Sequence, residues 1–419
     1  MRFKAKILFL IALAAVFSGC EKNSAKRYNP EKEIVMLYYA AAYNNLSSNI
    51  KGNLNVLKSA NMPFYGSKHR ILTFTHFSKT DSDYTTKTES HLVMLSKDFG
   101  KLRCDTLYTV SQDRFATDPA VLREVLLKVQ ELFPGAAYGL VFSSHGTGWL
   151  PVGKYNSSNF IEFALGNKKH SGTGPLYRYN EDEGSPKVKS FGAEVDKIGG
   201  VNYSREMTIQ DMAAAIPMHL DYILFDACLM GGIEVAYELK DVADKVAFSP
   251  TEVLARGFDY SDLSSLVSDH PCVEDFCKAY FDYYNACQGT EQSATISVVG
   301  TSGLAGLADM SRALFSKYRS QIAALGTHSG IQKYYRGDKH WFFDFEDILV
   351  KAGISDEDKS ALESVLGSCV SYKAATPAFL GIEINNYSGL SMYLPSAGDA
   401  QLNTFYKTLS WNKDTNLVE

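Results

Sequence analysis

Two short motifs place reactive side chains directly after apolar, strand-like runs. Residues 138–144 lead into His-Gly-Thr-Gly-Trp at 145–149, and residues 221–225 lead into Asp-Ala-Cys-Leu-Met-Gly at 226–231. Open α/β sheets carry their chemistry at the carboxyl ends of their strands. We therefore expect His145 and Cys228 to lie at the carboxyl edge of one sheet.

Cys228 and His145 together suit nucleophilic catalysis. A thiol attacks a carbonyl as the thiolate, which is favoured by the positive end of a following helix and by an imidazole that takes or shares the proton. The histidine precedes the cysteine by 83 residues, which is the order in caspases and the reverse of that in papain-like enzymes. The alternative for Cys228 is a packed core thiol, since cysteine is often buried, but it leaves both motifs unexplained.

The chain resembles the clostripain family of cysteine peptidases, in the clan of caspases, gingipains and legumains. The resemblance rests on four motifs in order, because the opening strand and turn at 35–45 and a late strand at 389–395 join the two motifs above. It implies a caspase-like, three-layer α/β/α sandwich around a mostly parallel sheet. It also implies peptide hydrolysis by a dyad of Cys228 and His145, with an oxyanion hole made by the backbone N–H groups of Gly146 and Cys228.

The resemblance also implies cleavage after arginine or lysine, which requires a carboxylate in the substrate pocket. Asp226, two residues before the cysteine, is one candidate, and Asp259 is the other. Asp226 could instead cap the helix that follows it. The family's loop around the second candidate commonly reads Pro-Gly-x-Gly-Trp-Asp-Tyr, whereas residues 254–260 read Leu-Ala-Arg-Gly-Phe-Asp-Tyr. Arg256 could neutralise such a pocket and shift the preference towards smaller or polar residues.

The first residues have the order of an export signal. A basic start is followed by the apolar run 7–17 and by the small residues Ser18 and Gly19 before Cys20. The apolar run is too short to span a bilayer as a helix, and small residues before a cysteine resemble a bacterial lipobox. We expect a signal peptide over 1–19, an acylated Cys20, a polar tether over 20–32 and anchoring to a membrane of the cell envelope. The alternative is an ordinary secretory signal.

The composition excludes nucleic acid as a partner class. Removal of residues 1–19 takes away three basic and no acidic residues, so the formal net charge falls from −5 to −8. A mildly acidic domain without basic runs repels a polyanion. The expected partners are a peptide or protein substrate and, through the anchor, a membrane, and we expect a monomer.

No cofactor is required for thiol chemistry, and no metal site is expected. Besides Cys20 and Cys228, five cysteines remain, so they cannot all be paired. Cys272, Cys277 and Cys287 match no zinc spacing and are expected to be core thiols or to form at most one disulfide. The acidic segment Phe343–Asp347 is a weak calcium candidate because it lacks the ligand number and glycine of an EF-hand loop. Capping of a helix is the alternative for these acids.

Strand-like runs alternate with amphipathic helical patterns from residue 34 to about residue 250. This alternation predicts strand–helix–strand units around a mostly parallel sheet, in a catalytic core over 33–260. An α+β extension over 261–419 is expected to pack on that core. The polar insert 151–207 lacks sustained hydrophobic periodicity, and it is either a surface loop or the place of an activating cut, as in many peptidases of this clan.

A second class of function remains open to such a chain. It could be a catalytically silent envelope lipoprotein that keeps the fold to bind peptides or glycans. Retention of Cys228, His145 and Gly146 together favours the peptidase, because a silent protein has no chemical reason to keep a thiolate dyad.

Overall fold

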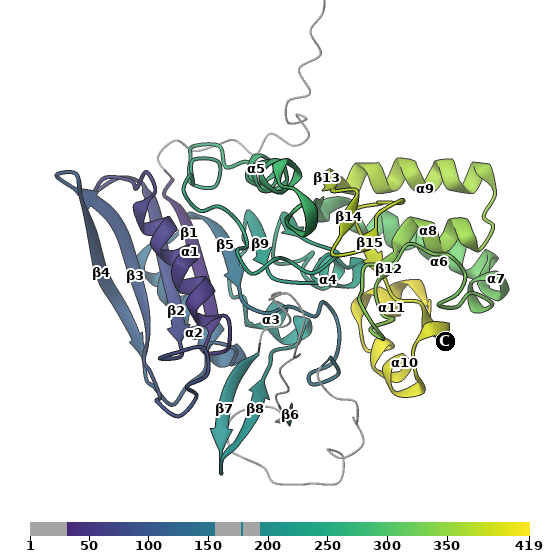
Figure 1. The fold of residues 1–419 in the computed structure, drawn as a ribbon. Coiled ribbons are helices and arrows are strands. Elements are labelled where there is room, and N and C mark those ends of the chain that lie inside the picture. The colour runs from purple at the N-terminus through teal and green to yellow at the C-terminus, as the bar shows by residue number, and fades with distance from the viewer. Residues whose placement is uncertain (1–31, 156–176, 179–192) are drawn as a thin grey trace, which may run out of the picture. The chain divides into compact units, whose positions relative to one another are not determined.

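The computed structural model describes residues 32–155, 177–178 and 193–419 (Figure 1). They contain a nine-stranded sheet with the order β13-β11-β10-β9-β5-β1-β2-β3-β4. Its centre is parallel. The central strands are β2 (His69–Phe77), β1 (Ile34–Ala42), β5 (Ala137–Ser143), β9 (Tyr222–Asp226) and β10 (Lys245–Phe248). Every residue of β1 and β9 is buried, as expected for parallel strands covered on both faces. The predicted α/β class is confirmed.

Antiparallel strands complete both edges of the sheet. β3 (Ser90–Asp98) and β4 (Lys101–Val110) follow β2 at one edge. At the other edge lie β11 (Thr295–Gly300) and β13 (Val370–Ala375). The C-terminal part of the chain therefore continues the central sheet in addition to packing on it.

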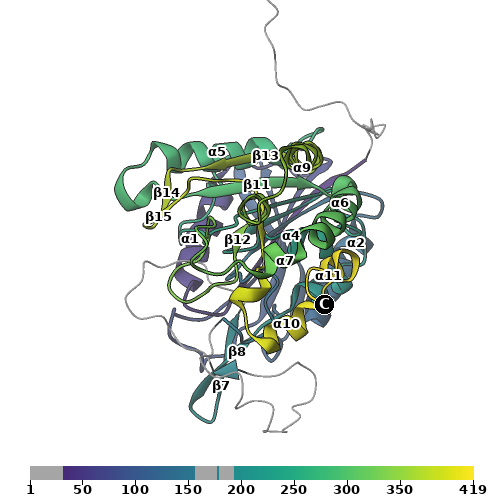
Figure 2. The same cartoon turned by 90° about the vertical axis from the view of Figure 1, so that its right-hand side faces the viewer.

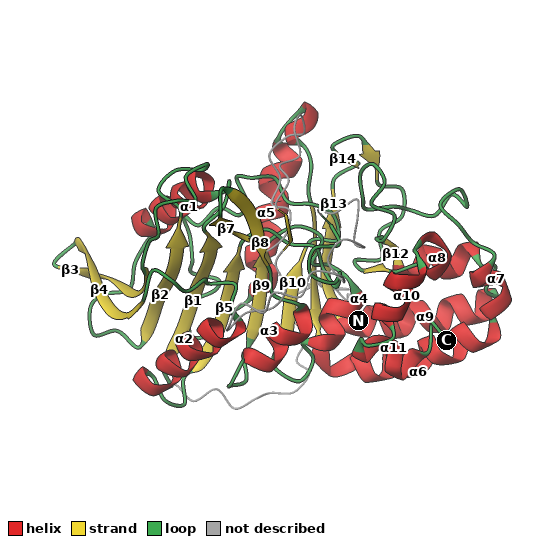
Figure 3. Cartoon of the chain, turned by 90° about the horizontal axis from the view of Figure 1, so that it is seen from below, coloured by secondary structure: helices red, strands yellow, loops and turns green. Residues whose placement is uncertain are grey.

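Helices cover both faces of the sheet (Figure 3). One face carries α1 (Ser47–Ser59) and α5 (Val273–Ala286). The other carries α2 (Pro119–Leu132), α3 (Ile209–Ala215) and α4 (Ile233–Glu238). Thr208 caps α3, because its hydroxyl accepts the N–H of Asp211 at 3.0 Å.

The remaining helices gather beyond the β13 edge (Figure 1 and Figure 2). They are α6 (Leu304–Lys317), α7 (Arg319–Ala323), α8 (Phe345–Lys351), α9 (Asp356–Cys369), α10 (Ala400–Tyr406) and α11 (Ser410–Thr415). Two short strands join them to the late motif, because β12 (Phe343–Asp344) pairs with β16 (Ser391–Met392). A further small pair is β14 (Ala378–Phe379) and β15 (Ile382–Glu383).

The insert contains regular structure that its sequence did not lead us to expect. β7 (Glu194–Ile198) and β8 (Val201–Arg205) form an antiparallel hairpin, and β6 (Tyr177–Arg178) pairs with β8. Gly199 and Gly200 form the turn with φ of 60° and 84°, a conformation open to glycine and suited to the twist of a two-residue hairpin. The absence of sustained hydrophobic periodicity in the insert therefore did not predict the β7–β8 hairpin.

Some predictions fall outside the described residues. These are the signal peptide, the lipidation site Cys20 and most of the tether, together with the insert positions 156–176 and 179–192. Within the described ranges, no helix is long and apolar enough to cross a membrane.

Candidate active site

The register of β5 and β9 determines where the two reactive side chains emerge. These strands are parallel neighbours, and Ser143 and Asp226 are the last paired residues. His145 and Cys228 each follow the end of their strand by two residues, and they are 4% and 0% exposed. The structure thus places both at the carboxyl edge of adjacent strands.

Gly146 brings the main chains of the two motifs into contact. A Cβ atom at this position would lie 2.2 Å from the carbonyl oxygen of Cys228 and 2.9 Å from its nitrogen. Any larger residue would push the strand ends apart, so the approach requires glycine. The main chains that carry the two proposed oxyanion-hole donors are therefore in direct contact.

The residue after the cysteine has an unusual backbone. Leu229 has φ of 58°, a conformation that a non-glycine residue rarely adopts and that costs free energy unless the surroundings impose it. The N–H of Leu229 donates to Thr251 and that of Gly231 to Ser249, both at 2.8 Å. These bonds hold Cys228 in a fixed turn between β9 and α4.

The expected effect of a helix dipole on the thiol is small. α4 has six residues and begins at Ile233, so its N-terminal turn is separated from Cys228 by the turn just described. Dipole effects fall off within the first turn of a helix. Val253 contacts the Cys228 sulfur instead: its N–H donates to the sulfur at 3.0 Å, and its carbonyl accepts from the thiol at 3.6 Å. The shorter bond, from a donor to sulfur, favours the thiolate. Cys104, Cys277, Cys287 and Cys369 are free thiols.

An ion pair between a buried carboxylate and a partly exposed guanidinium lies next to this sulfur contact. Glu252, which is 4% exposed, precedes Val253 and accepts from Nη2 of Arg336 at 2.9 Å and from its Nε at 2.5 Å. The hydrogen bond to Glu252 is the main reason that the pKa of Arg336 is raised, and the charge of Cys228 adds to the effect. The sequence assigned no role to either residue, because the two partners lie 84 positions apart in the chain.

Asn45 contacts the catalytic histidine candidate. Its Oδ1 lies 2.8 Å from Nε2 of His145, and it follows the end of β1, the other neighbour of β5. Asn45 belongs to the opening motif of the sequence, but it received no role there. His145 also lines a small, mostly apolar pocket with Phe142, Met207, Met212, Phe225 and Met230.

Asp226 lies inside the protein beside the two motifs. It is 0% exposed, and its Oδ2 accepts from the hydroxyls of Tyr260 at 2.9 Å and Ser143 at 3.1 Å. Burial, and then the charge of Asp226, raises the pKa values of Tyr38 and Tyr260. The alternative that Asp226 caps the following helix is wrong, since Gly232 is the N-cap of α4 and no side chain caps it.

The structure does not bring Asp259 to the thiol. Phe258 and Tyr260 are buried, so the residue between them faces solvent, and the Asp259 carboxylate accepts the N–H of Ser261 at 2.9 Å. It lines a separate acidic surface pocket with Asp262, His270 and Asp275, among others. Arg256 is exposed as well, and its guanidinium lies 4.3 Å from the ring centre of Tyr283.

The acidic segment Phe343–Asp347 serves a helix. Asp344 caps α8 by accepting the N–H of Asp347 at 2.9 Å, and it also accepts the N–H of Ser388 at 2.7 Å. Asp347 accepts the N–H of Gln332 at 2.7 Å. Within the described ranges, no three His, Cys, Asp or Glu side chains are grouped so that they could hold a metal ion.

Comparisons with known proteins agree with this architecture. The chain is similar to the solved structure of an inactive zymogen C11 protease from Parabacteroides distasonis, with 27% identity, a TM-score of 0.70 and coverage of 92% of this chain and 98% of that chain. A secreted C11 cysteine protease from Bacteroides thetaiotaomicron, solved with an irreversible peptide inhibitor, shares the fold at 20% identity and a TM-score of 0.70, with 92% and 99% covered. No curated protein matches the chain.

The sequence comparison is more specific. The model of the clostripain family matches residues 179–416, which is more than half of the chain and includes Cys228 and the C-terminal extension. The chain therefore belongs to the clostripain family of cysteine peptidases.

Proposed function

We propose that this peptidase is an endopeptidase in which Cys228 is the nucleophile and His145 its acid/base partner. The observation that carries the proposal is the β5–β9 register, which places both residues at one strand edge. The thiolate attacks the scissile carbonyl carbon, and the resulting oxyanion accepts from the N–H groups of Gly146 and Cys228. The imidazolium then gives its proton to the leaving amine. Water, deprotonated by the imidazole, hydrolyses the thioester and regenerates the thiol.

Preference for arginine or lysine before the scissile bond is the second part of the proposal. Asp226 lies on the strand that carries Cys228 and is fully buried, and the hydroxyls of Ser143 and Tyr260 orient its carboxylate. A substrate cation that leaves water needs such a partner, since an unpaired buried charge is costly. Asp259 is too exposed for this role, so Asp226 is the proposed pocket acid.

The place of action is the third part. We propose that residues 1–19 are removed, that Cys20 is acylated, and that the tether holds the enzyme at a membrane of the cell envelope, where it acts as a monomer. No cofactor is needed for the thiol chemistry, and a calcium requirement has no support from the capping roles of Asp344 and Asp347.

The nucleophile is tested with C228A, with C104A as the matched control because Cys104 is an exposed free thiol on β4. C228A should abolish peptide hydrolysis and active-site alkylation by iodoacetamide, whereas C104A should keep both. H145A should lower kcat by about a hundredfold or more. Normal hydrolysis by C228A would overturn the mechanism.

Specificity is tested with peptides that carry arginine, lysine, alanine or aspartate before the scissile bond. D226N should lower kcat/KM for the arginyl peptide by about a hundredfold or more, and for the alanyl peptide far less. D259N is the control and should leave both values unchanged. Equal cleavage after alanine by the wild type would reject the basic preference and leave the dyad intact.

Anchoring is tested by fractionation. The wild type should partition with membranes, and C20S should be released or remain unprocessed. An unmodified mature N-terminus in mass spectrometry would reject the lipid anchor.

A further inference from the structure

A buried polar network at the ends of β1, β2 and β5 lies beside the dyad but has no part in the proposed chemistry. We infer that Asn45 is a positioning residue for His145, and that the buried pair of Glu194 and His76 holds Asn45 in place. Glu194 lies within the insert, as the first residue of β7, so this contact links the insert to the active site. The inference rests on the proposed roles of Cys228 and His145.

The first link joins Asn45 and His145. An amide oxygen accepts hydrogen bonds, so the 2.8 Å contact from Asn45 Oδ1 requires a proton on Nε2 of the imidazole. The neutral ring then keeps its lone pair on Nδ1, the nitrogen that can take the thiol proton. The same contact stabilises the imidazolium after proton transfer. Asn45 thus selects both the tautomer and the orientation of the ring.

The second link fixes the turn that carries Asn45. The neighbouring Asn44 is fully buried, and its Nδ2 donates to the carbonyl of Ala193 at 2.9 Å. Its Oδ1 accepts the N–H of Leu46 at 2.9 Å. Ser144, next to the histidine, donates to the carbonyl of Ala41 at 2.7 Å. Asn45 therefore has little freedom to move, and the fixed turn contacts Ala193 of the insert.

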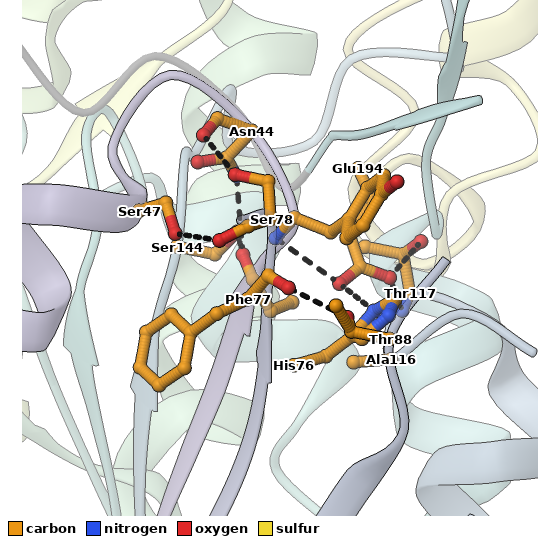
Figure 4. Close-up of polar contacts among 12 residues, drawn as sticks. Asn44, Ser47, His76, Phe77, Ser78, Thr88, Ala116, Thr117, Ser144 and Glu194 are labelled. Carbon is orange, nitrogen blue, oxygen red and sulfur yellow. Dashed lines mark hydrogen bonds and ion pairs between the residues drawn. The ribbon is translucent and has the colours of Figure 1, made fainter. Parts of the chain in front are cut away.

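The third link is the buried carboxylate of Glu194, which is 0% exposed. Oε1 lies 2.6 Å from Nδ1 of His76 and 3.4 Å from the N–H of Tyr43. Oε2 accepts the N–H of Thr117 at 3.1 Å. Figure 4 shows Glu194 between His76 and Thr117, with Asn44, Ser78 and Ser144 in the same network. One carboxylate thus joins the ends of β1 and β2 with the segment before α2.

The network gives residues 193–195 of the insert a defined position. An unpaired carboxylate in this interior would be costly, so Glu194 is bound firmly where its donors converge. The N–H of Val195 donates to the carbonyl of Tyr43 at 2.8 Å, which adds a main-chain bond to the same place. Displacement of residues 193–195 would remove contacts on both Tyr43 and Asn44. The turn that holds Asn45, and hence the imidazole, would then lose its support.

Variants of Asn45 test the first link. N45A should lower kcat about tenfold to a hundredfold with little change in KM, because a misplaced imidazole impairs proton transfer more than binding. The alkaline limb of the pH profile of kcat should move to lower pH in N45A, because the imidazolium loses a hydrogen-bond acceptor that stabilises it. N45D restores the acceptor and adds a charge, so its alkaline limb should move above that of the wild type. A purely structural role would not move the two limbs in opposite directions.

A double-mutant cycle tests the link through Glu194. E194Q should lower kcat in the wild type but change it little in the N45A background, because both substitutions act through the contact between Asn45 and His145. Should E194Q fail to fold, E194D keeps the charge and shifts the carboxylate. E274Q is the control: it breaks the Glu274–Lys245 pair at the opposite end of β10 and should leave the pH profile unchanged.

The outcomes are distinct. Unchanged kcat and pH limbs in N45A and N45D would overturn the positioning role of Asn45. Independent, multiplicative effects of N45A and the Glu194 variant would overturn the link to the insert. The proposed function would fail separately, through normal hydrolysis by C228A.

Discussion

Two fully buried carboxylates near the active site have opposite environments. Glu194 lies 2.6 Å from an imidazole, whereas Glu234, which follows the cysteine motif, accepts from the N–H of Tyr393 at 2.9 Å and the hydroxyl of Tyr406 at 2.7 Å. Without a cation beside it, burial raises the pKa of Glu234 to about 7. The Glu194 carboxylate has an imidazole as its partner. The Glu234 carboxylate has no cation beside it among the described residues, so its burial favours the protonated, neutral form.

The two carboxylates have different structural roles. Trp149 of the histidine motif packs with ring centroids 4.9 Å from both Tyr393 and Tyr406. Gly232 leaves no room for a side chain, since a Cβ there would lie 2.8 Å from Glu234 Oε2. The Glu234 cluster, which consists of Trp149, Glu234, Tyr393 and Tyr406, therefore packs the histidine, cysteine and late-strand motifs against one another. The Glu194 cluster instead contacts the turn that holds the imidazole.

The largest expected effect comes from removal of the imidazole beside Glu194. H76A leaves the fully buried Glu194 carboxylate with neutral donors only, and it should lower the free energy of unfolding by about 3–5 kcal/mol. The measurement is urea denaturation at neutral pH. H219A is the matched control, because His219 and Asp244 form an exposed pair at 2.8 Å whose loss should cost about 1 kcal/mol or less. Equal losses in the two variants would contradict the contrast between the sites.

An intermediate effect is expected from titration of Glu234. Its pKa is raised from 4.5 to about 7, so the unfolded chain loses its proton first as the pH rises. The stability from this group is complete below pH 4.5 and is lost as the pH rises through 7, by about 3 kcal/mol in total. E234Q should remove this slope from the free energy of unfolding measured over that window. E194Q should retain it, and loss of the slope in both variants would reject the assignment to Glu234.

The sequence predicted the parts of the site that depend on local pattern. Apolar runs that lead into His145 and Asp226 predict strand ends, and β5 and β9 end within one residue of those runs. The β7–β8 hairpin could have been found from Gly199-Gly200, a strong turn signal between two short runs. Periodicity shows which face of an element is buried, but it does not identify a partner far along the chain.

The missed polar contacts illustrate this limit. His76 and Glu194 are separated by 118 positions, and Glu252 and Arg336 by 84. Asn45 could be placed at a strand end, but nothing in its neighbours shows that its amide faces an imidazole. These residues come together only in the folded chain. The local sequence around each of them carries no information about its distant partner.

Glu252 extends the comparison to a third buried carboxylate, whose cation is the Arg336 guanidinium at 2.9 Å. The charge of Cys228 contributes to the raised pKa of Arg336, so removal of Arg336 should in turn disfavour the thiolate. R336A should raise the pH midpoint of Cys228 alkylation by about one unit, equivalent to about 1.4 kcal/mol, and R336K by less because it keeps the charge. The double variant E252Q/R336A removes both charges, so its midpoint should return towards that of the wild type. An unchanged midpoint in R336A would show that the pair holds the loop before Val253 without acting on the sulfur.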